Sequence, residues 1–550
     1  MKSFLLRAAC AAALILPAYP AQSAEIDPAR IASHVQVLAS DEFEGRAPAT
    51  EGEVKTVAYI SEQFRAAGLQ PGGDLKDGAR AWTQDVPLAK FEISGPISVA
   101  VKSRGQTQAW TQGEEVAIRA AQTGVDRVSV KDAPIVFLGY GVHAPERNWD
   151  DFKGVDLKGK IGLVLVNDPD FETGEGDFGG RAMTYYGRWT YKYEEAARQG
   201  ALGFLVIHET APASYGWATV KNSNTNTIFD IIRANPGEAH APIEGWVQRD
   251  VAAALIAASG HDFEALKKQA QTRDFRPVQL DATFSTDFAV AAEKIVSKNV
   301  VGLIPGAKRP DETIVYTSHW DHLGVGQPDA RGDRIYNGAI DNADGIGTMI
   351  EIGRALAAGP RPDRSIVFLA VTAEERGLLG SEYYAANPLY PLGKTVANIN
   401  MDALSAAGPA RDFTSSGDAA STLQDMLIAV GAEKGRAYTP DPRPEAGSFF
   451  RSDHFPFAKR GVPAISFGSG RDLVNGGREA GDAWARAYTA ERYHQPADEF
   501  GPDWNLDGMA QDGELMLELG RRLANSAVWP EWKAGSEFKA TRDETAAQRK

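Results

Sequence analysis

Acidic and imidazole side chains that can bind metal ions follow several strand-like segments in the second half of the chain. Histidine nitrogens and carboxylate oxygens are the groups that hold divalent ions in hydrolytic sites. Three of these segments end where a predicted strand ends, and open α/β sheets place ligands beyond the carboxyl ends of their strands. The sequence therefore predicts a two-metal hydrolase. The candidate metal ligands are His319, Asp341, Glu375, Asp402 and His494.

The first predicted ion lies between three of these ligands. His319 closes the β-branched and aromatic run 313–317, and Asp321 would bind the other ring nitrogen and fix the tautomer. Asp341 opens a glycine-rich helical segment, and its two oxygens suit it to bridge two ions about 3.5–4 Å apart. Asp402 ends a later strand and would complete the shell of His319.

The second predicted ion and the general base come from an adjacent acidic pair. Glu374 and Glu375 follow the strand 365–371, and neighbouring residues cannot point the same way. We therefore expect Glu375 to bind metal with His494, while Glu374 stays free as a general base. With Asp341 shared, each ion would keep open positions for water and substrate.

Each motif alone has a more common interpretation. A single His-x-Asp is usually a strand-end pair, an adjacent Glu-Glu is usually a solvated helix start, and Asn-x-Asp is usually a turn. Their coincidence at the ends of three predicted strands favours one common site.

These segments resemble those of the secreted bacterial di-zinc aminopeptidases, a family that also contains glutamate carboxypeptidase, glutaminyl cyclase and the non-catalytic transferrin receptor. The resemblance implies that His319, Asp341 and Asp402 hold one zinc ion. It implies that Asp341, Glu375 and His494 hold the other, with Glu374 as base. The matching segments are 318–321, 338–345, 373–381, 400–402 and 493–494.

The resemblance implies three further features. The peptide after Asp341 is expected to be cis, and Tyr493 is expected to face the developing oxyanion. Residues 452–455 with 461–463 resemble a pocket wall, which makes Asp453 and His454 candidates for supporting the ligands. An equally good interpretation of His454 is a helix-start residue bonded to backbone.

The first two dozen residues predict an export signal. Lys2 and Arg7 form a positive start, residues 8–16 an apolar core, and residues 21–24 a small-residue cleavage site. A membrane anchor is the weaker alternative, since the apolar run is short of the roughly 20 residues that span a bilayer. We expect export to periplasm or medium, without stable membrane insertion once the signal is removed.

Composition agrees with a large globular enzyme. The chain has 550 residues, 43% of them hydrophobic, and a net charge of −15 that disfavours nucleic acid and anionic lipid as partners. The single cysteine, Cys10, lies within the predicted signal, so the mature chain would carry no disulfide.

Alternating strands and helices predict an α/β fold with a doubly wound, mostly parallel sheet. We expect a discontinuous peptidase domain (25–132 and 285–530) that contains an insert (133–284), followed by a frayed polar tail (531–550). Residues 31–72 read as helical scaffold and residues 82–130 as short alternating strands. The remaining expected strands are 313–317, 365–371, 396–401, 464–467 and one ending at 303; the expected helices are 345–358, 380–386, 419–431 and 508–524.

The insert reads as strand, strand, helix and strand, which resembles the protease-associated domain that relatives insert into the peptidase fold. Long insertions in compact domains are usually functional, so we favour a lid or substrate-positioning module over a passive spacer. Its histidines lack ligand-like spacing and are interpreted as surface or core residues. They are His143, His208, His240 and His261.

The predicted activity is hydrolysis of peptides by a hydroxide that bridges the two ions, with Glu374 as base and Tyr493 stabilising the oxyanion. A free substrate amino terminus is implied by the resemblance, so an aminopeptidase is expected. A carboxypeptidase or dipeptidase is the main alternative, because Arg451, Arg460 and Arg471 lie near the pocket-wall segment. The complete second ligand set speaks against a glutaminyl cyclase and against a non-catalytic binding protein.

Overall fold

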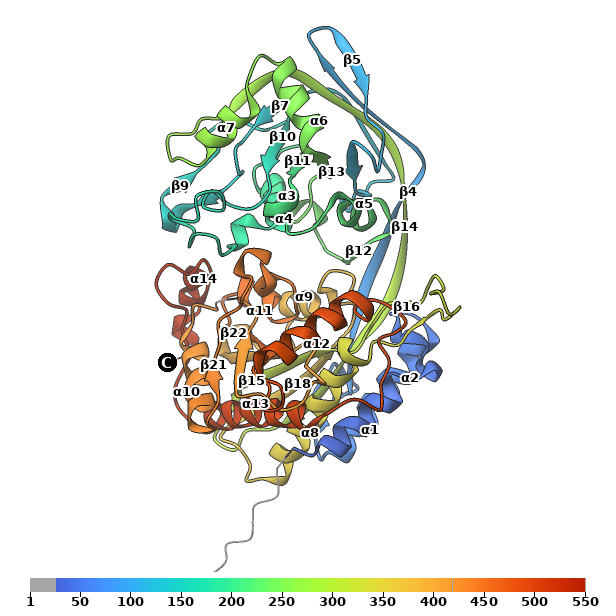
Figure 1. The fold of residues 1–550 in the computed structure, drawn as a ribbon, viewed down its shortest axis with the longest axis vertical. Helices are drawn as coiled ribbons and strands as arrows, with labels where there is room; N and C mark the ends of the chain where they lie inside the picture. Colours follow the sequence, from blue (N-terminus) through green and yellow to red (C-terminus); the bar gives the residue numbers. More distant parts are fainter. Residues whose placement is uncertain (1–25, 418, 550) are drawn as a thin grey trace, which may run out of the picture.

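The computed structural model describes residues 26–417 and 419–549, which form two lobes joined by a long two-stranded ribbon (Figure 1). We call them the main lobe, which carries the predicted metal ligands, and the insert lobe. The predicted signal at 1–24, with Cys10, lies outside the described residues. Among the described helices, none has the length and apolar character needed to cross a bilayer.

Four parallel strands form the centre of the main lobe. They are ordered β22 (Ala464–Ser469), β19 (Thr395–Met401), β15 (Arg309–His319) and β18 (Arg364–Val371), and β14 (Val278–Ile304) pairs antiparallel with β18. Every residue of β18 and β19 is buried, as expected for a sheet covered on both faces. The predicted α/β class with a mostly parallel sheet is confirmed.

The strand register brings the predicted ligands to one edge of the sheet. His319 pairs with Val371, so the residues that follow β18 emerge beside it. Thr317 pairs with Asn400, which places Asp402 level with His319. Because these strands are parallel, their carboxyl ends meet at the same edge.

Two groups of helices pack beside the sheet (Figure 1). The first contains α1 (Pro28–Leu38), α8 (Asp344–Ala358) and α13 (Asp507–Asn525), which contact one another. The second contains α9 (Leu379–Ala386) and α11 (His454–Lys459). The predicted main-lobe helices are confirmed with small shifts at their ends. The other helices of this lobe are α2 (Glu51–Ala66), α10 (Thr422–Glu433) and α12 (Gly477–Glu491), and its outer strands are β20 (Asp412–Ser415) and β21 (Ala437–Tyr438).

One continuous strand, β4 (Thr83–Ser103), replaces the short strands expected from residue 82 onward. It pairs antiparallel with β14 along most of its length, and the two strands form the ribbon between the lobes (Figure 1). Gly95, at φ +77°, lies where the pairing register shifts between Asp287 and Ala289. Such an irregularity bends a ribbon without ending it, so one long strand runs through the region where several short strands were expected.

The insert lobe has its own parallel sheet, ordered β7 (Arg127–Phe137), β10 (Ile161–Leu165), β11 (Gly203–His208) and β13 (Ile243–Gln248). The predicted order of strand, strand, helix and strand is confirmed by β7, β10, α3 and β11. β6 (Val116–Ile118) pairs with β13, so this sheet includes residues before 133. The expected boundaries at 132/133 and 284/285 fall inside β7 and β14. The other elements here are β5 (Gln106–Ala109), β12 (Ile228–Ile231), α3 (Trp189–Arg198), α4 (Thr210–Ala213), α5 (Trp217–Thr225), α6 (Arg249–Ala258) and α7 (Phe263–Ala270).

The prediction of a frayed carboxy-terminal tail is wrong. Trp532 and Phe538 are buried, and Arg542 in α14 (Lys539–Glu544) donates to the carbonyl of Thr395 at 3.0 Å. The tail also reaches the insert lobe, where the backbone N–H of Tyr185 donates to Glu537 at 3.1 Å. The tail is polar on average, but a few of its aromatic residues pack on the main lobe, and the prediction did not take them into account.

Candidate metal centre

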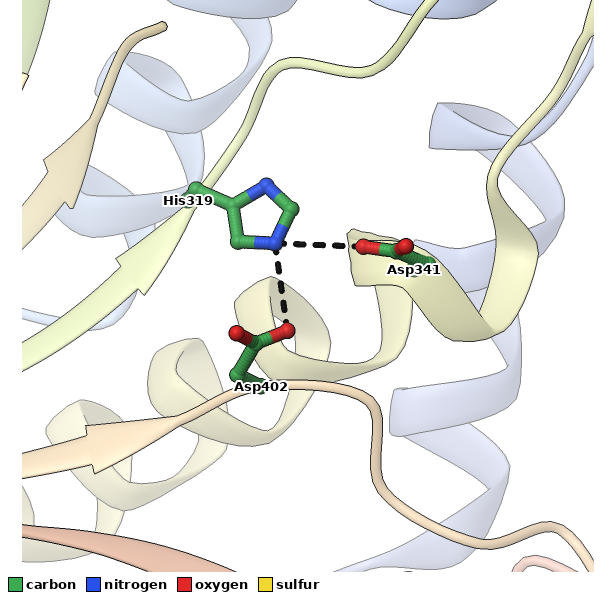
Figure 2. A group of neighbouring side chains, drawn as sticks. All are labelled: His319, Asp341 and Asp402. Atoms are coloured by element: carbon green, nitrogen blue, oxygen red, sulfur yellow. Dashed lines mark hydrogen bonds and ion pairs between the residues drawn. The ribbon is translucent and has the colours of Figure 1, made fainter. Parts of the chain in front are cut away.

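The first group of ligands surrounds the ring of His319, the last residue of β15 (Figure 2). Its Nε2 lies 3.2 Å from Oδ1 of Asp341 and 3.2 Å from Oδ1 of Asp402. Asp341 lies in an irregular helical turn (Ala339–Ala343) directly before α8, and Asp402 directly follows β19. The peptide between Asp341 and Asn342 is cis, as the resemblance implied.

The second group shares Asp341 with the first. Nε2 of His494 lies 3.2 Å from Oδ2 of Asp341 and 3.2 Å from Oε2 of Glu375. The two oxygens of Asp341 therefore face two different imidazoles. The structure brings together all five ligands predicted from the sequence.

The donor set fits two zinc ions. Zinc bonds of about 2.0–2.1 Å to nitrogen and oxygen place neighbouring tetrahedral ligand atoms roughly 3.3 Å apart, close to the separations seen here. Burial alone would lower the pKa of His494, but hydrogen bonds to Asp341 and Glu375 raise it to about 10. The ring is thus held in its protonated form between two carboxylates, where a divalent cation can replace the proton.

The orientation of His319 is fixed by the backbone of Asp321. Nδ1 of His319 lies 3.1 Å from the Asp321 carbonyl oxygen, whereas the nearest carboxylate oxygen is 3.8 Å away. The predicted partner residue is therefore present, but a different atom makes the contact. The Asp321 carboxylate instead accepts the backbone N–H of Glu374 at 3.1 Å, so it holds the start of the loop that carries the candidate base.

Glu374 is half-buried and lines a cavity of about 400 Å³ between the two lobes. Burial raises the pKa of its carboxyl well above the usual value, and the neighbouring Asp402 carboxylate adds to the shift. The described residues make no hydrogen bond to this carboxylate. It is available to exchange a proton with a molecule in the cavity.

Tyr493 lines the same cavity. Its ring stacks on His494 with centroids 3.9 Å apart, and 40% of the residue is exposed. Burial of much of the side chain and the nearby Asp341 carboxylate raise the pKa of its hydroxyl, so the group stays a proton donor.

The insert lobe supplies one wall of this cavity. Arg119, Arg188 and His240 line it together with Glu374 and Tyr493 of the main lobe. A second cavity of about 460 Å³ lies on the side of Asp402, lined largely by polar and small residues. The metal centre is thus flanked by two cavities, and the one shared with the insert lobe contains the candidate base.

Several supporting residues were not found from the sequence. Nδ1 of His322 lies 2.7 Å from Oε1 of Glu375, and the ring is fully buried. One ligand atom from each of His322, Asp341 and Glu375 lies within 4.8 Å of the others, so His322 is a further candidate ligand of the second group. The His-x-x-His spacing of residues 319 and 322 was the available signal. Ser452 donates to Oδ2 of Asp402 at 2.5 Å. Asp498 accepts the backbone N–H groups of residues 340 and 341 at 3.1–3.2 Å, a contact that sequence spacing could not reveal.

Asp453 and His454 lie near the centre without entering either ligand group. Asp453 accepts the hydroxyl of Ser381 at 2.6 Å, and burial raises its pKa to about 7. His454 begins α11 and packs edge-on against Phe449, with ring centroids 4.7 Å apart. Burial lowers its pKa to about 3, so the ring is neutral at physiological pH.

Only some of the remaining candidates have structural partners. Arg460 pairs with Glu382 at 2.8 Å and Arg471 with Asp482 at 3.5 Å, whereas Arg451 lines the inter-lobe cavity. His143 and His261 are exposed, His208 contacts a backbone carbonyl, and His240 lies between two carboxylates. None of these four histidines joins a ligand group among the described residues.

The centre thus belongs to an α/β domain whose acidic and imidazole ligands converge at the carboxyl ends of parallel strands. Residues 299–519 match the model of Peptidase family M28, so this segment is similar to that family. The match includes all five candidate ligands and the candidate base.

Curated relatives match shorter segments. Aminopeptidase NAALADL1 of Mus musculus is 38% identical over 112 residues, 19% of this chain and 13% of that protein. A glutamate carboxypeptidase 2 homolog of Caenorhabditis briggsae is 32% identical over 200 residues, 31% of this chain and 24% of that protein. Aminopeptidase YwaD of Bacillus subtilis is 30% identical over 177 residues, 31% of this chain and 35% of that protein. The chain therefore spans little more than a third of these relatives at most.

Among solved structures, the chain is similar to an aminopeptidase from Aneurinibacillus sp. strain AM-1. The TM-score is 0.49 at 17% identity, with 91% of this chain and 95% of that chain covered. A zinc aminopeptidase from Bacillus subtilis gives a TM-score of 0.42 at 18% identity, with 92% and 97% covered.

Proposed function

We propose that the protein is a zinc-dependent exopeptidase that binds two Zn²⁺ ions and releases amino-terminal residues from peptides. The observation that carries this proposal is the position of Asp341, whose two oxygens face separate imidazole and carboxylate pairs beside the cavity of Glu374. The match of residues 299–519 to a peptidase family supports the same chemistry.

His319, Asp341 and Asp402 would hold one zinc ion, and Asp341, Glu375 and His494 the other. Bound there, the pair would polarise a peptide carbonyl and lower the pKa of a water molecule toward neutrality. The protein fixes these ligands in advance, because Asp402 is held by Ser452 and the ring of His319 by the carbonyl of Asp321.

The proton transfers fall to Glu374. Its carboxylate would accept a proton from the attacking water and deliver it to the departing amine, which balances the hydrolysis without a further donor. The hydroxyl of Tyr493 would donate a hydrogen bond to the oxygen on which negative charge develops. Both side chains line the same cavity, so a peptide bond bound there can meet both.

A second candidate function, cleavage directed by the carboxyl end of a peptide, is favoured by two arginines. Arg188 of the insert lobe is buried, and Arg451 of the main lobe is exposed; both line the cavity. In the described part of the chain, neither guanidinium has a carboxylate within ion-pair distance. A substrate carboxylate would supply the missing counter-charge, as in a carboxypeptidase or dipeptidase.

One set of substrates separates these functions. An aminopeptidase hydrolyses an aminoacyl anilide and fails on the N-acetylated form, because it requires a free amine. An enzyme that reads the carboxyl end prefers a dipeptide to its amide, and Arg188→Met would remove that preference. If hydrolysis of both substrates continued unchanged after zinc was removed with a chelator, both proposed functions would be contradicted.

We further propose that the insert lobe acts as a lid and that residues 1–24 direct export. The lid proposal is supported by Arg119, Arg188 and His240, which reach the cavity of Glu374. Sequencing the amino terminus of the mature protein tests the export signal, and a mature chain that starts at Met1 would contradict it.

A further inference from the structure

Arg46 is a fully buried arginine that belongs to no predicted ligand or base. It lies in the short 3-10 segment between α1 and α2 and is 1% exposed. In the described part of the chain, no carboxylate lies within ion-pair distance of its guanidinium. A buried charge without a charged partner is costly unless hydrogen bonds stabilise it.

The guanidinium donates four hydrogen bonds, all to backbone carbonyls. Nε donates to Trp320 at 2.8 Å and Nη2 to Gly338 at 2.8 Å. Nη1 donates to Leu38 at 2.7 Å and to Asn337 at 2.5 Å. The rigid planar fork of an arginine can reach acceptors in several directions at once, which the single ammonium of lysine cannot.

Two of the contacted segments carry zinc ligand candidates. Trp320 directly follows His319, and Gly338 lies three residues before Asp341. Arg46 also returns a contact through its own carbonyl, which accepts the backbone N–H of His322 at 3.4 Å. One side chain therefore joins the loop of the first imidazole to the loop of the bridging carboxylate.

The backbone that presents Arg46 is confined. Gly45 has φ +64°, and a Cβ there would lie 2.5 Å from the carbonyl oxygen of Tyr336 and 2.6 Å from that of Gly324. Arg46 itself has φ +53°. The segment therefore packs tightly against the short antiparallel pair formed by residues 324–325 and 335–336. This close contact fixes the direction in which the side chain of Arg46 leaves the backbone.

The charge of Arg46 also faces the acidic centre. The carboxylates of Asp498, Asp321, Asp341 and Glu375 all act on it electrostatically. A fixed positive charge behind these acids reduces their mutual repulsion before any cation binds.

We propose that Arg46 is a positioning residue that sets the separation of the His319 and Asp341 loops in the metal-free protein and thereby raises its affinity for zinc. The proposal rests on the proposed zinc centre but not on the choice of substrate. Replacing a residue that orients metal ligands through hydrogen bonds typically lowers metal affinity by about 10- to 100-fold.

Arg364 provides a control that is matched in burial, and unlike Arg46 it also pairs with a carboxylate, that of Glu312, at 2.5 Å. It is also fully buried, and its Nη1 donates to the carbonyls of Leu523 and Val528 at 2.9 and 2.8 Å. It begins β18, at the opposite end of the strand from the metal centre. Its replacement tests the loss of a buried arginine without disturbing the ligand loops.

The experiment compares Arg46→Lys and Arg46→Met with Arg364→Lys. Zinc affinity of the metal-free proteins is measured by competition with a chromophoric chelator, and amide hydrogen exchange is followed at residues 340 and 341. We expect Arg46→Lys to weaken zinc binding at least about 10-fold and to speed exchange at these amides. Arg364→Lys is expected to lower the melting temperature while leaving zinc affinity within about twofold of wild type.

Wild-type zinc affinity in Arg46→Lys would overturn the proposal. So would equal losses of affinity in the Arg46 and Arg364 variants, because they would report general destabilisation. If Arg46→Met does not fold, the lysine variant carries the comparison. Substrate plays no part in these measurements, so a protein that binds zinc and cleaves no peptide would refute the proposed function and leave this inference standing.

Discussion

Nε2 of His494 lies 3.2 Å from Oδ2 of Asp341, the oxygen that does not face His319. His494 comes from the loop after α12, whereas Asp341 precedes α8. The carboxylate therefore connects two half-sites from distant parts of the chain, and both half-sites depend on it. Loss of Asp341 and loss of a ligand private to one half-site should have different consequences.

We expect Asp341→Ala to abolish tight binding of both zinc ions, whereas Asp402→Ala should remove one. The reason is that Asp402 contacts only the His319 half-site. Zinc content after dialysis, measured by plasma mass spectrometry, should be close to zero and one equivalent, respectively. One retained equivalent in Asp341→Ala would show that the half-sites are independent.

Sequence patterns located the ligands because the controlling contacts are local. His319 ends β15 and Asp402 directly follows β19, and parallel pairing of these two strands then brings their carboxyl ends together without further information. His494 was predicted as the second imidazole ligand from its residue type, and the resemblance implied the same role, although nothing in its neighbourhood predicts contact with Glu375. Its φ of +57° and the turn after α12 result from tertiary packing.

Other features escaped prediction for identifiable reasons. α12 fully buries only Gly481, and its aromatic residues Trp484 and Tyr488 are half-buried; their helical spacing of four residues was the available signal and was missed. The contacts of Arg46 join segments that are distant in sequence, and all its acceptors are backbone carbonyls, which carry no residue signature. The carboxylate of Asp321 was assigned to His319 because spacing alone cannot distinguish a side-chain oxygen from the backbone carbonyl beside it.

Replacement of Glu374 tests the base directly. Glu374→Gln keeps the volume of the side chain but cannot accept a proton, so turnover should fall by at least about 100-fold. Zinc content should not change, because Glu374 belongs to neither ligand group. Steady-state kinetics and metal analysis on one preparation check both statements, with exposed Glu92→Gln as the control. Wild-type turnover with full zinc would disprove the role.

His240 should make stability depend on pH. It lies between Asp230 and Glu244 at 3.0 and 2.9 Å, and Arg233 and Arg119 pair with the same two acids. Burial alone would lower the pKa of His240, but the two carboxylates raise it to about 9. The unfolded value is about 6.5. The contribution, on the order of 3 kcal/mol, is therefore complete below pH 6.5 and is lost as the pH rises through 9.

The measurement is the difference between wild type and His240→Asn in the free energy of unfolding at pH 6 and pH 9.5. We expect the variant to be less stable at pH 6 and to approach wild type at pH 9.5. Exposed His261→Asn should follow wild type at both values. A constant difference between wild type and His240→Asn would mean that folding does not raise the pKa of this ring.

The packed carboxy-terminal tail should protect itself from proteolysis. Trp532 is 2% exposed, donates to the carbonyl of Gly461 at 2.9 Å and packs on Phe538 with ring centroids 5.0 Å apart. Trp532→Ala should cost about 3–5 kcal/mol, as for other large core truncations. Trypsin should then cut at Lys533 and Lys539 much faster than in wild type.

The control is the exposed Glu544→Ala, which should leave the rate of cleavage unchanged. Equal rates in wild type and Trp532→Ala would mean that the tail is already free in solution, and that its contact with Tyr185 of the insert lobe cannot hold the lobes together.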